Sequence, residues 1–503
     1  MEKSIELNKV EKQKGSSYRQ IMKATSIFGG VQVFNILISI LRSKIMAVLL
    51  GPAGVGILGL LNTTILLISS LTNFGLGISG VKDIATAKDS NDEFRLAKTI
   101  SALNRLIWLT GVAGSLITLF GAKWLSQMAF GNTEYTIAFI WLSITVLLKQ
   151  LASGHFVILQ GLRKLKDLAK ANMIGSAIGL ALSIPFYYYL GLEGIVPGLV
   201  ITALATFIVA LYFGKSIKKE RVPLPFKELK AEGKGMMTMG FILSLSGIMV
   251  LGESYILRVF INYSGGVEEV GLYNAGIALI TTYVGLLFTA METDYYPRLA
   301  SVALNNSKAN ELINQQTEIA LLILAPVLVG LMVFIDWVII ILYSSEFLAA
   351  NVMIYWAFLG LFFKVPAWVI GFIFIAKGKS KLFFWNELIS NLYLLLFNIL
   401  GYHYWGLEGL GISFLVSYMV YLGQVYFIAS RKYRFSFQKG FSRIFGLQFI
   451  FGVLCLVGIT MLNTLWMYIL GVLLILLSGY FSLVELDKRL GLRQLISGFF
   501  GKK

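Results

Sequence analysis

Residues 194–214 read GIVPGLVITALATFIVALYFG, an apolar run without a charged side chain. A helix needs about 20 apolar residues to cross a hydrocarbon core about 30 Å thick. The run therefore has the length and composition of one membrane-spanning helix. Similar runs recur along the whole chain, so they cannot be explained by a signal peptide or by one buried core helix.

The overall composition also indicates a membrane protein. Of the 503 residues, 57% are hydrophobic and only 14% are charged, whereas about a quarter of the residues in soluble domains are charged. The length rule predicts fourteen spans and an all-α polytopic fold. They cover approximately residues 24–50, 53–80, 100–121, 135–159, 171–190, 194–214, 237–261, 270–292, 316–342, 351–376, 383–402, 406–428, 445–463 and 465–485.

Lysine and arginine are distributed unevenly between the loops. Nearly all of those outside the spans lie in one alternating set of loops, and the other set contains only Lys123. Cytoplasmic loops carry such an excess, so both termini are predicted to be cytoplasmic. The net charge of +17 then needs no nucleic-acid partner, although some of these side chains can contact anionic lipid head groups.

Two short motifs recur 215 residues apart. The motif at 55–57 recurs at 270–272, and Gly-Leu-Glu-Gly at 191–194 recurs at 406–409. Six spans lie in each copy, which predicts two parallel six-helix lobes around a central cavity, followed by two extra helices. The predicted parts are a cytoplasmic segment 1–23, an N-lobe 24–214, a linker 215–236, a C-lobe 237–428, a helix pair 445–485 and a cytoplasmic tail 486–503.

Several cations fall inside the predicted spans, where a charge is costly and usually faces a cavity. Lys149 and Lys364 are 215 residues apart, and the counterpart of Arg258 would fall between Arg42 and Lys44. We expect these five side chains to face the central cavity and to bind an anion such as phosphate or pyrophosphate. Arg105, Glu292, Glu387 and Glu485 lie near span ends and are expected only to reach the membrane surface.

Few residues suit other chemistry. Cys455 is the only cysteine, and the two histidines are far apart, so we predict no catalytic residue, no metal site and no cofactor. The two Gly-Lys-Ser sequences lack the glycine that a phosphate-binding loop requires. Glu253 and Asp336 are the candidates for coupling transport to an ion gradient.

The turn after the first span, Ala47-Val48-Leu49-Leu50-Gly51-Pro52-Ala53-Gly54-Val55-Gly56, resembles that of a known group of transporters. Together with two six-span lobes and basic cavity residues, it is similar to the multidrug/oligosaccharidyl-lipid/polysaccharide exporter superfamily, and most similar to bacterial O-antigen translocases. Many polysaccharide exporters carry Arg where Val48 stands. The resemblance covers about residues 20–430, and the extra pair 445–485 resembles the lipid II flippase branch.

This resemblance implies a transporter of the bacterial inner membrane that serves O-antigen, and hence lipopolysaccharide, biosynthesis. It would flip an undecaprenyl-pyrophosphate-linked glycan from the cytoplasmic to the periplasmic leaflet by alternating access. Membrane lipids, a polysaccharide polymerase and chain-length proteins are the partners that it implies.

Two alternatives remain. A multidrug or metabolite antiporter of the same fold would need a carboxylate in its cavity, for which Glu253 is the candidate. A membrane-embedded polymerase or glycosyltransferase would need a large loop or a catalytic domain, and no predicted periplasmic loop is long enough.

Overall fold

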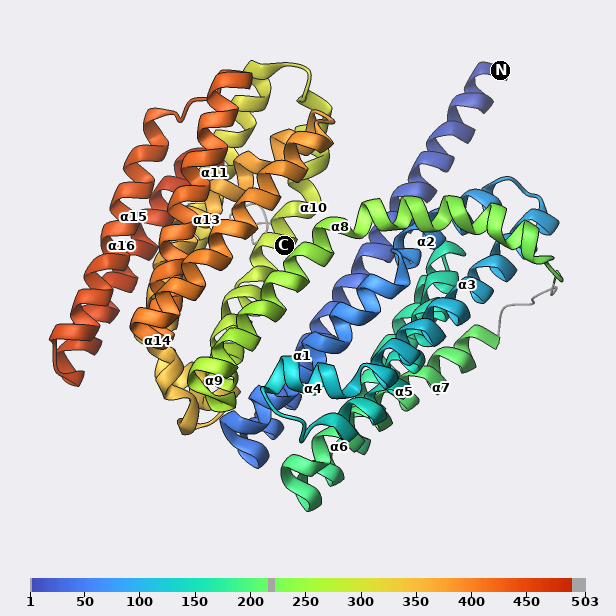
Figure 1. Ribbon diagram of the computed structural model, residues 1–503. Helices are drawn as coiled ribbons and strands as arrows, with labels where there is room; N and C mark the ends of the chain where they lie inside the picture. Colours follow the sequence, from blue (N-terminus) through green and yellow to red (C-terminus); the bar gives the residue numbers. More distant parts are fainter. Residues whose placement is uncertain (1, 216–221, 491–503) are drawn as a thin grey trace, which may run out of the picture. The chain divides into compact units, whose positions relative to one another are not determined.

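The computed structural model describes residues 2–215 and 222–490, and all their regular elements are helices (Figure 1). Residues 216–221 of the predicted linker, residues 491–503 of the predicted tail and the side chains of the predicted N-terminal segment lie outside the described part. A bilayer supplies no water for backbone groups, so helices that satisfy their own hydrogen bonds are expected in a chain this apolar.

The chain forms two compact units, Met1–Tyr255 and Ile256–Lys503, which divide within α8. The elements of the first unit are α1 (Glu2–Asn73), α2 (Leu76–Asp89), α3 (Glu93–Phe120), α4 (Ala122–Phe130), α5 (Thr136–Gly161), α6 (Leu165–Leu190), η1 (Gly191–Gly194), α7 (Ile195–Lys215) and most of α8 (Phe226–Gly265). The elements of the second unit are α9 (Val267–Ala278), η2 (Leu279–Tyr283), α10 (Gly285–Val302), α11 (Asn306–Val333), α12 (Ile335–Leu342), η3 (Ser345–Ala350), α13 (Asn351–Ala376), α14 (Ser380–Tyr433), α15 (Lys439–Met461) and α16 (Thr464–Leu490).

Eleven stretches of the described residues are helical, long and apolar enough to cross a membrane. Three of them contain a sharp change of direction, at Gly51 in α1, at Gly191 between α6 and α7, and at Gly406 in α14. When the two arms of each bent stretch are counted separately, the fourteen predicted spans are recovered. The fold is therefore that of an all-α polytopic membrane protein, as predicted.

The backbone repeats at the same offset as the sequence motifs. Positive φ angles occur at Gly51 and Gly266, at Gly191 and Gly406, and at Arg163 and Gly378, and each pair is 215 residues apart. Helices α5 and α13 both have 26 residues and begin at this offset. Glycine adopts a positive φ without strain, which explains why the shared Gly-Leu-Glu-Gly motif begins with one. The bounds of the two predicted lobes stay predictions.

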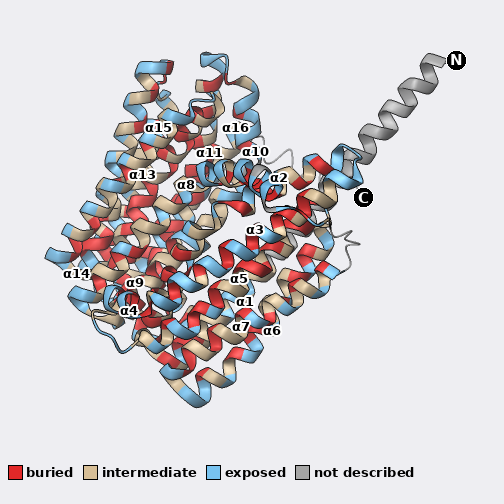
Figure 2. Cartoon of the chain, turned by 45° about the vertical axis from the view of Figure 1, so that its right-hand side comes forward, coloured by how far each residue is buried: buried red, intermediate tan, exposed pale blue. Residues whose placement is uncertain are grey.

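Each unit has an apolar core, and apolar side chains also cover its outside. Figure 2 shows buried residues along the helices with exposed ones beside them. On α16, the exposed side chains include Leu465, Trp466, Ile469 and Leu476. A soluble protein rarely leaves so much apolar surface in water, so these faces suit contact with lipid.

The last two helices are attached to the second unit through α11. Arg489 of α16 donates to Glu318 of α11 at 2.8 Å and also pairs with Glu485, and both carboxylates are largely buried. Glu485 is therefore buried and paired with Arg489 one helical turn away, a contact that the sequence analysis did not predict.

The segment between residues 215 and 236 differs from the predicted loop. Helix α8 begins at Phe226, eleven residues before the predicted span at 237–261. Leu229, Gly233 and Met236 are buried, and this spacing of three and four residues forms one helix face. The lysines between them made the segment resemble a loop in the sequence.

Candidate functional site

The cations of the first unit come from two helices of the bundle. Arg42 on α1 lies within electrostatic range of Lys149 on α5 and of Tyr187 on α6. Arg42 and Lys149 are half-buried, and the Nε atom of Arg42 is buried without a hydrogen-bond partner. Two like charges thus lie within electrostatic range of each other inside an apolar bundle.

Counter-ions for this pair are absent from the described side chains. No carboxylate of the described part forms an ion pair with Arg42 or Lys149. Like charges in a medium of low dielectric constant repel each other more strongly than in water. An anion bound beside both side chains would relieve this repulsion and would accept the unused N–H of Arg42.

Lys44 is also half-buried on α1. Side chains two positions apart leave a helix in different directions, so Lys44 and Arg42 project to different sides of α1. The sequence could identify both residues as buried cations, and their spacing already places them on different faces of one helix.

Lys364 on α13 is surrounded by aromatic rings in the second unit. Its Nζ atom lies 5.1 Å from the ring centroid of Tyr418 and 5.7 Å from those of Phe288 and Phe414. Aromatic faces attract a cation within about 6 Å. Three rings therefore stabilise this charge where no carboxylate of the described residues pairs with it.

Arg258 is held by neighbours on the adjoining helix. Its Nε atom donates to Oδ1 of Asn274 at 2.7 Å, and its guanidinium group lies 5.3 Å from the ring centroid of Tyr273. These two contacts, with a side-chain amide and an aromatic ring, orient the guanidinium group of Arg258 toward α9. The prediction that all five cations border one chamber stays a prediction.

The two predicted ion-coupling residues have different surroundings. Glu253 is half-buried on α8, whereas Asp336 is exposed and accepts a hydrogen bond from Asn351. Neither position tests a role in coupling. The exposure of Asp336 agrees with its predicted place at the end of a span.

A carboxylate network in the second unit was missed in the sequence. Glu387, expected to reach the surface, accepts a hydrogen bond from the Tyr421 hydroxyl group at 2.7 Å, and Gln424 donates to Asn386 beside it at 2.8 Å. The four side chains come from the two arms of α14. Only the fold of this helical hairpin brings them together, because 34 residues separate Glu387 from Tyr421.

Arg105 also has a partner that the sequence did not reveal. It donates to the backbone carbonyl of Leu224, immediately before α8. This contact fixes the start of α8 against α3. The sequence could not reveal this partner, because the segment that Arg105 binds had been assigned to a loop, and the prediction that Arg105 reaches the membrane surface stays a prediction.

Comparison with known proteins gives this arrangement a context. The family model for "Polysaccharide biosynthesis protein" matches residues 45–352. The lipid III flippases of Escherichia coli (strain K12) and Shigella flexneri are each 24% identical over 395 residues, which cover 76% of this chain and 91% of theirs.

Among solved structures, the lipid II flippase MurJ in an inward closed conformation is similar with a TM-score of 0.72 and 14% identity, over 93% of this chain and 99% of that one. An inward-facing multidrug resistance MATE family transporter of the MOP superfamily is similar with a TM-score of 0.64 and 17% identity, over 80% of this chain and 94% of that one. These likenesses show a shared fold, an all-α multi-pass membrane fold. Because the family model matches more than half of the residues, the chain belongs to the polysaccharide biosynthesis protein family.

Proposed function

We propose that this protein is a flippase that moves a polyprenyl-pyrophosphate-linked oligosaccharide of the O-antigen type from the cytoplasmic to the periplasmic leaflet. Its membership of the family and its similarity to lipid III flippases support the class of substrate. The inner bacterial membrane, cytoplasmic termini and the undecaprenyl form of the lipid belong to the same proposal.

The observation that carries the proposal is the pair of Arg42 and Lys149. A transporter that moves a cation would be expected to have acids at such a place, whereas this pair is matched by an anion. A pyrophosphate group offers oxygens for a guanidinium fork and for an ammonium group together. Lys364, whose charge is held by rings, would provide a further anion contact in the second unit.

Transport requires that this contact be reversible. Cation–π contacts contribute about 0.5–2 kcal/mol, while a hydrogen bond between a charged pair contributes about 1.5–3 kcal/mol. The three ring contacts of Lys364 together contribute about 1.5–6 kcal/mol, which is comparable with one or two charged hydrogen bonds. A phosphate can therefore compete with the rings for Lys364, and the rings can bind the side chain again when the phosphate leaves. The ammonium group of Lys364 thus has a favourable contact both when phosphate is bound and when it is absent.

The test is complementation of a bacterial strain that lacks its O-antigen flippase. The chain is expected to restore surface polysaccharide and to lower the amount of lipid-linked intermediate held in the cytoplasmic leaflet. Expression of the full chain in the membrane is measured by immunoblotting. Well-expressed protein that leaves the intermediate in the cytoplasmic leaflet, in strains with several different glycans, would contradict the proposal.

A further inference from the structure

The first part of α8 lies across the neighbouring helices of the first unit. The whole of α8 has 40 residues, which measure about 60 Å along the helix axis at 1.5 Å per residue. This length is about twice the thickness of a hydrocarbon core. Figure 1 shows this part crossing near α2 and α3. A Cβ atom on Gly75 would lie 2.0 Å from the carbonyl oxygen of Gly240, so the backbones touch at this crossing.

A hollow lies between α3 and this part of α8. Its volume is about 560 Å³, within the range of ordinary ligand sites. Leu106 and Leu109 of α3 line one side, with Phe74 beside them, and Met237 and Ile242 of α8 line the other. The walls are therefore almost entirely apolar.

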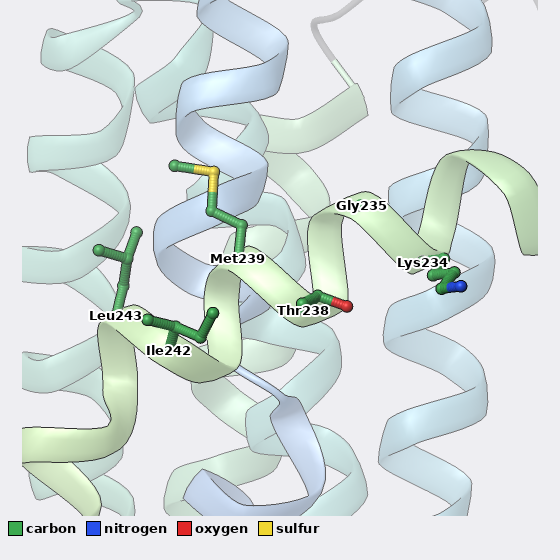
Figure 3. A pocket seen from close by; sticks show the side chains of 6 residues that line it. All are labelled: Lys234, Gly235, Thr238, Met239, Ile242 and Leu243. Atoms are coloured by element: carbon green, nitrogen blue, oxygen red, sulfur yellow. The ribbon is translucent and has the colours of Figure 1, made fainter.

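A second hollow of about 580 Å³ continues along α8. It shares Lys234, Thr238 and Ile242 with the first, and Figure 3 shows these side chains at successive turns of the helix. The spacing of four residues places them on one side of α8. Together the two hollows form an elongated apolar surface with a lysine at one end.

Two lysines of α8, Lys230 and Lys234, line the hollow. The acids of this helix segment are occupied elsewhere, because Lys98 of α3 binds Glu228 at 3.1 Å and Glu232 at 3.3 Å. No carboxylate of the described residues pairs with either lysine that lines the hollow. The site thus combines an apolar interior with uncompensated positive charge.

We propose that this hollow binds an anionic phospholipid of the surrounding bilayer. One acyl chain would fill the space between Leu109 and Ile242, and the phosphate group would contact Lys230 and Lys234. Free phosphate would leave the apolar walls unused, and an apolar molecule without charge would leave the lysines unused. Leu109 and Ile242 are themselves exposed, so the hollow opens onto an apolar surface that a bilayer lipid can reach.

Native mass spectrometry of the purified full chain in detergent tests this inference. The probes are phosphatidylglycerol and phosphatidylcholine with identical acyl chains, and the wild-type protein is expected to retain phosphatidylglycerol preferentially. Lys230→Gln with Lys234→Gln should lower that preference about tenfold or more, because each basic residue near a membrane surface contributes roughly a fivefold factor. The matched control, Lys381→Gln with Lys432→Gln, removes two exposed lysines outside the hollow and should retain the preference.

A second variant separates the acyl-chain site from the charge. Leu109→Trp fills the hollow from an exposed position and should weaken retention of both phospholipids without changing their ratio. Unchanged preference after loss of Lys230 and Lys234, or an equal loss in the control, would overturn the inference. Displacement of phosphatidylglycerol by an equimolar amount of undecaprenyl phosphate would also overturn it, since the hollow would then be a site for the transported lipid. The assay measures binding alone, so its result is independent of the proposed transport activity.

Discussion

The buried cations of the first unit cost free energy through desolvation and mutual repulsion, and a bound anion would offset that cost. Arg42 and Lys149 interact across the interface of α1 and α5, and no described carboxylate is paired with them. Proteins retain such unfavourable arrangements mainly where function requires them. If the pair binds substrate, removing one charge should raise the stability of the empty protein and lower transport, whereas a structural pair would lose stability.

We predict that Lys149→Met stabilises the empty protein and impairs transport. Methionine removes a desolvated charge and its repulsion with Arg42, so thermal unfolding in detergent should occur at a higher temperature. The initial rate at which surface polysaccharide appears should fall roughly ten- to a hundredfold, as expected for the loss of one charged hydrogen bond. Lys123→Met, at an exposed position, is the control and should change neither quantity. A less stable Lys149→Met protein would show that the lysine is structural.

Asp83 on α2, outside the candidate spans, leads to a pH-dependent prediction. Burial raises the pKa of its carboxyl group, Lys82 opposes this shift, and Glu232 adds to it. A raised pKa in the folded state means that stability decreases as pH rises from about 3.9, the ordinary value, through the folded pKa. Asp83→Asn should therefore unfold at a higher temperature than the wild type at pH 7, with a difference that shrinks toward pH 4. A constant difference across this range would exclude titration of Asp83 as the cause.

At the residue scale, the sequence identified the buried charged residues but not the side chains that contact them. Lys149 and Lys364 could be found because a lysine inside an apolar run is unusual. The rings around Lys364 could not, since Phe288 and Tyr418 lie on other helices. The bond of Glu387 could not be predicted for the same reason, because its partner Tyr421 lies on the returning arm of α14.

At the element scale, the two units share a hydrogen bond between equivalent helix ends, but the lysine that donates it lies at opposite ends of the contact in the two units. In the first unit, Lys88 Nζ donates to the carbonyl oxygen of Leu162 at 2.6 Å. In the second, Lys377 Nζ donates to the carbonyl oxygen of Ala303. Residues 88 and 303 are 215 apart, and so are residues 162 and 377. Each unit therefore ties the same two helix ends together, with the lysine on opposite sides of the contact.

This exchange predicts a rescue. Lys377→Leu removes this bond, a bond to Asn306 and a contact with the ring of Tyr433, and should lower the free energy of unfolding by about 1–3 kcal/mol. Adding Ala303→Lys should restore about 1 kcal/mol of that stability, because the new lysine has the position that Lys88 has in the first unit. Thermal unfolding of both variants and of Ala303→Lys alone checks this. A double variant no more stable than Lys377→Leu would show that the two hydrogen bonds are not equivalent.

The helices themselves could be predicted where one physical signal dominated. Apolar length determined the spans, and lysine and arginine determined the alternation of loops. The beginning of α8 could not be predicted, because its helix face consists of few apolar residues among Lys227, Lys230 and Lys234. Its helical conformation depends on contacts with α3, including the bonds of Lys98 and Arg105, which are absent from any local pattern.

At the scale of the whole molecule, orientation in the bilayer is a prediction that labelling can test. With Cys455 replaced by Ala, single cysteines at Ser264 and Asn463 should react with a membrane-impermeant maleimide added to intact cells. A cysteine at Ser436 should react only after the cells are opened. All three positions are exposed, so accessibility to water is not limiting once the reagent reaches that side. Labelling at Ser436 in intact cells would contradict the predicted topology.

The claim that the buried cations hold a pyrophosphate during transport is tested most directly by measuring the leaflet of the lipid. Purified protein in sealed vesicles should move a polyprenyl-pyrophosphate-linked oligosaccharide from one leaflet to the other, detected by a lectin added outside. In the double variant Lys149→Ala with Lys364→Ala, this rate should be roughly ten- to a hundredfold lower or less still, since each lysine supplies a charged contact. Lys149→Arg with Lys364→Arg should retain more, because the charges remain. Full activity of the double alanine variant, in vesicles containing equal amounts of folded protein, would contradict the account.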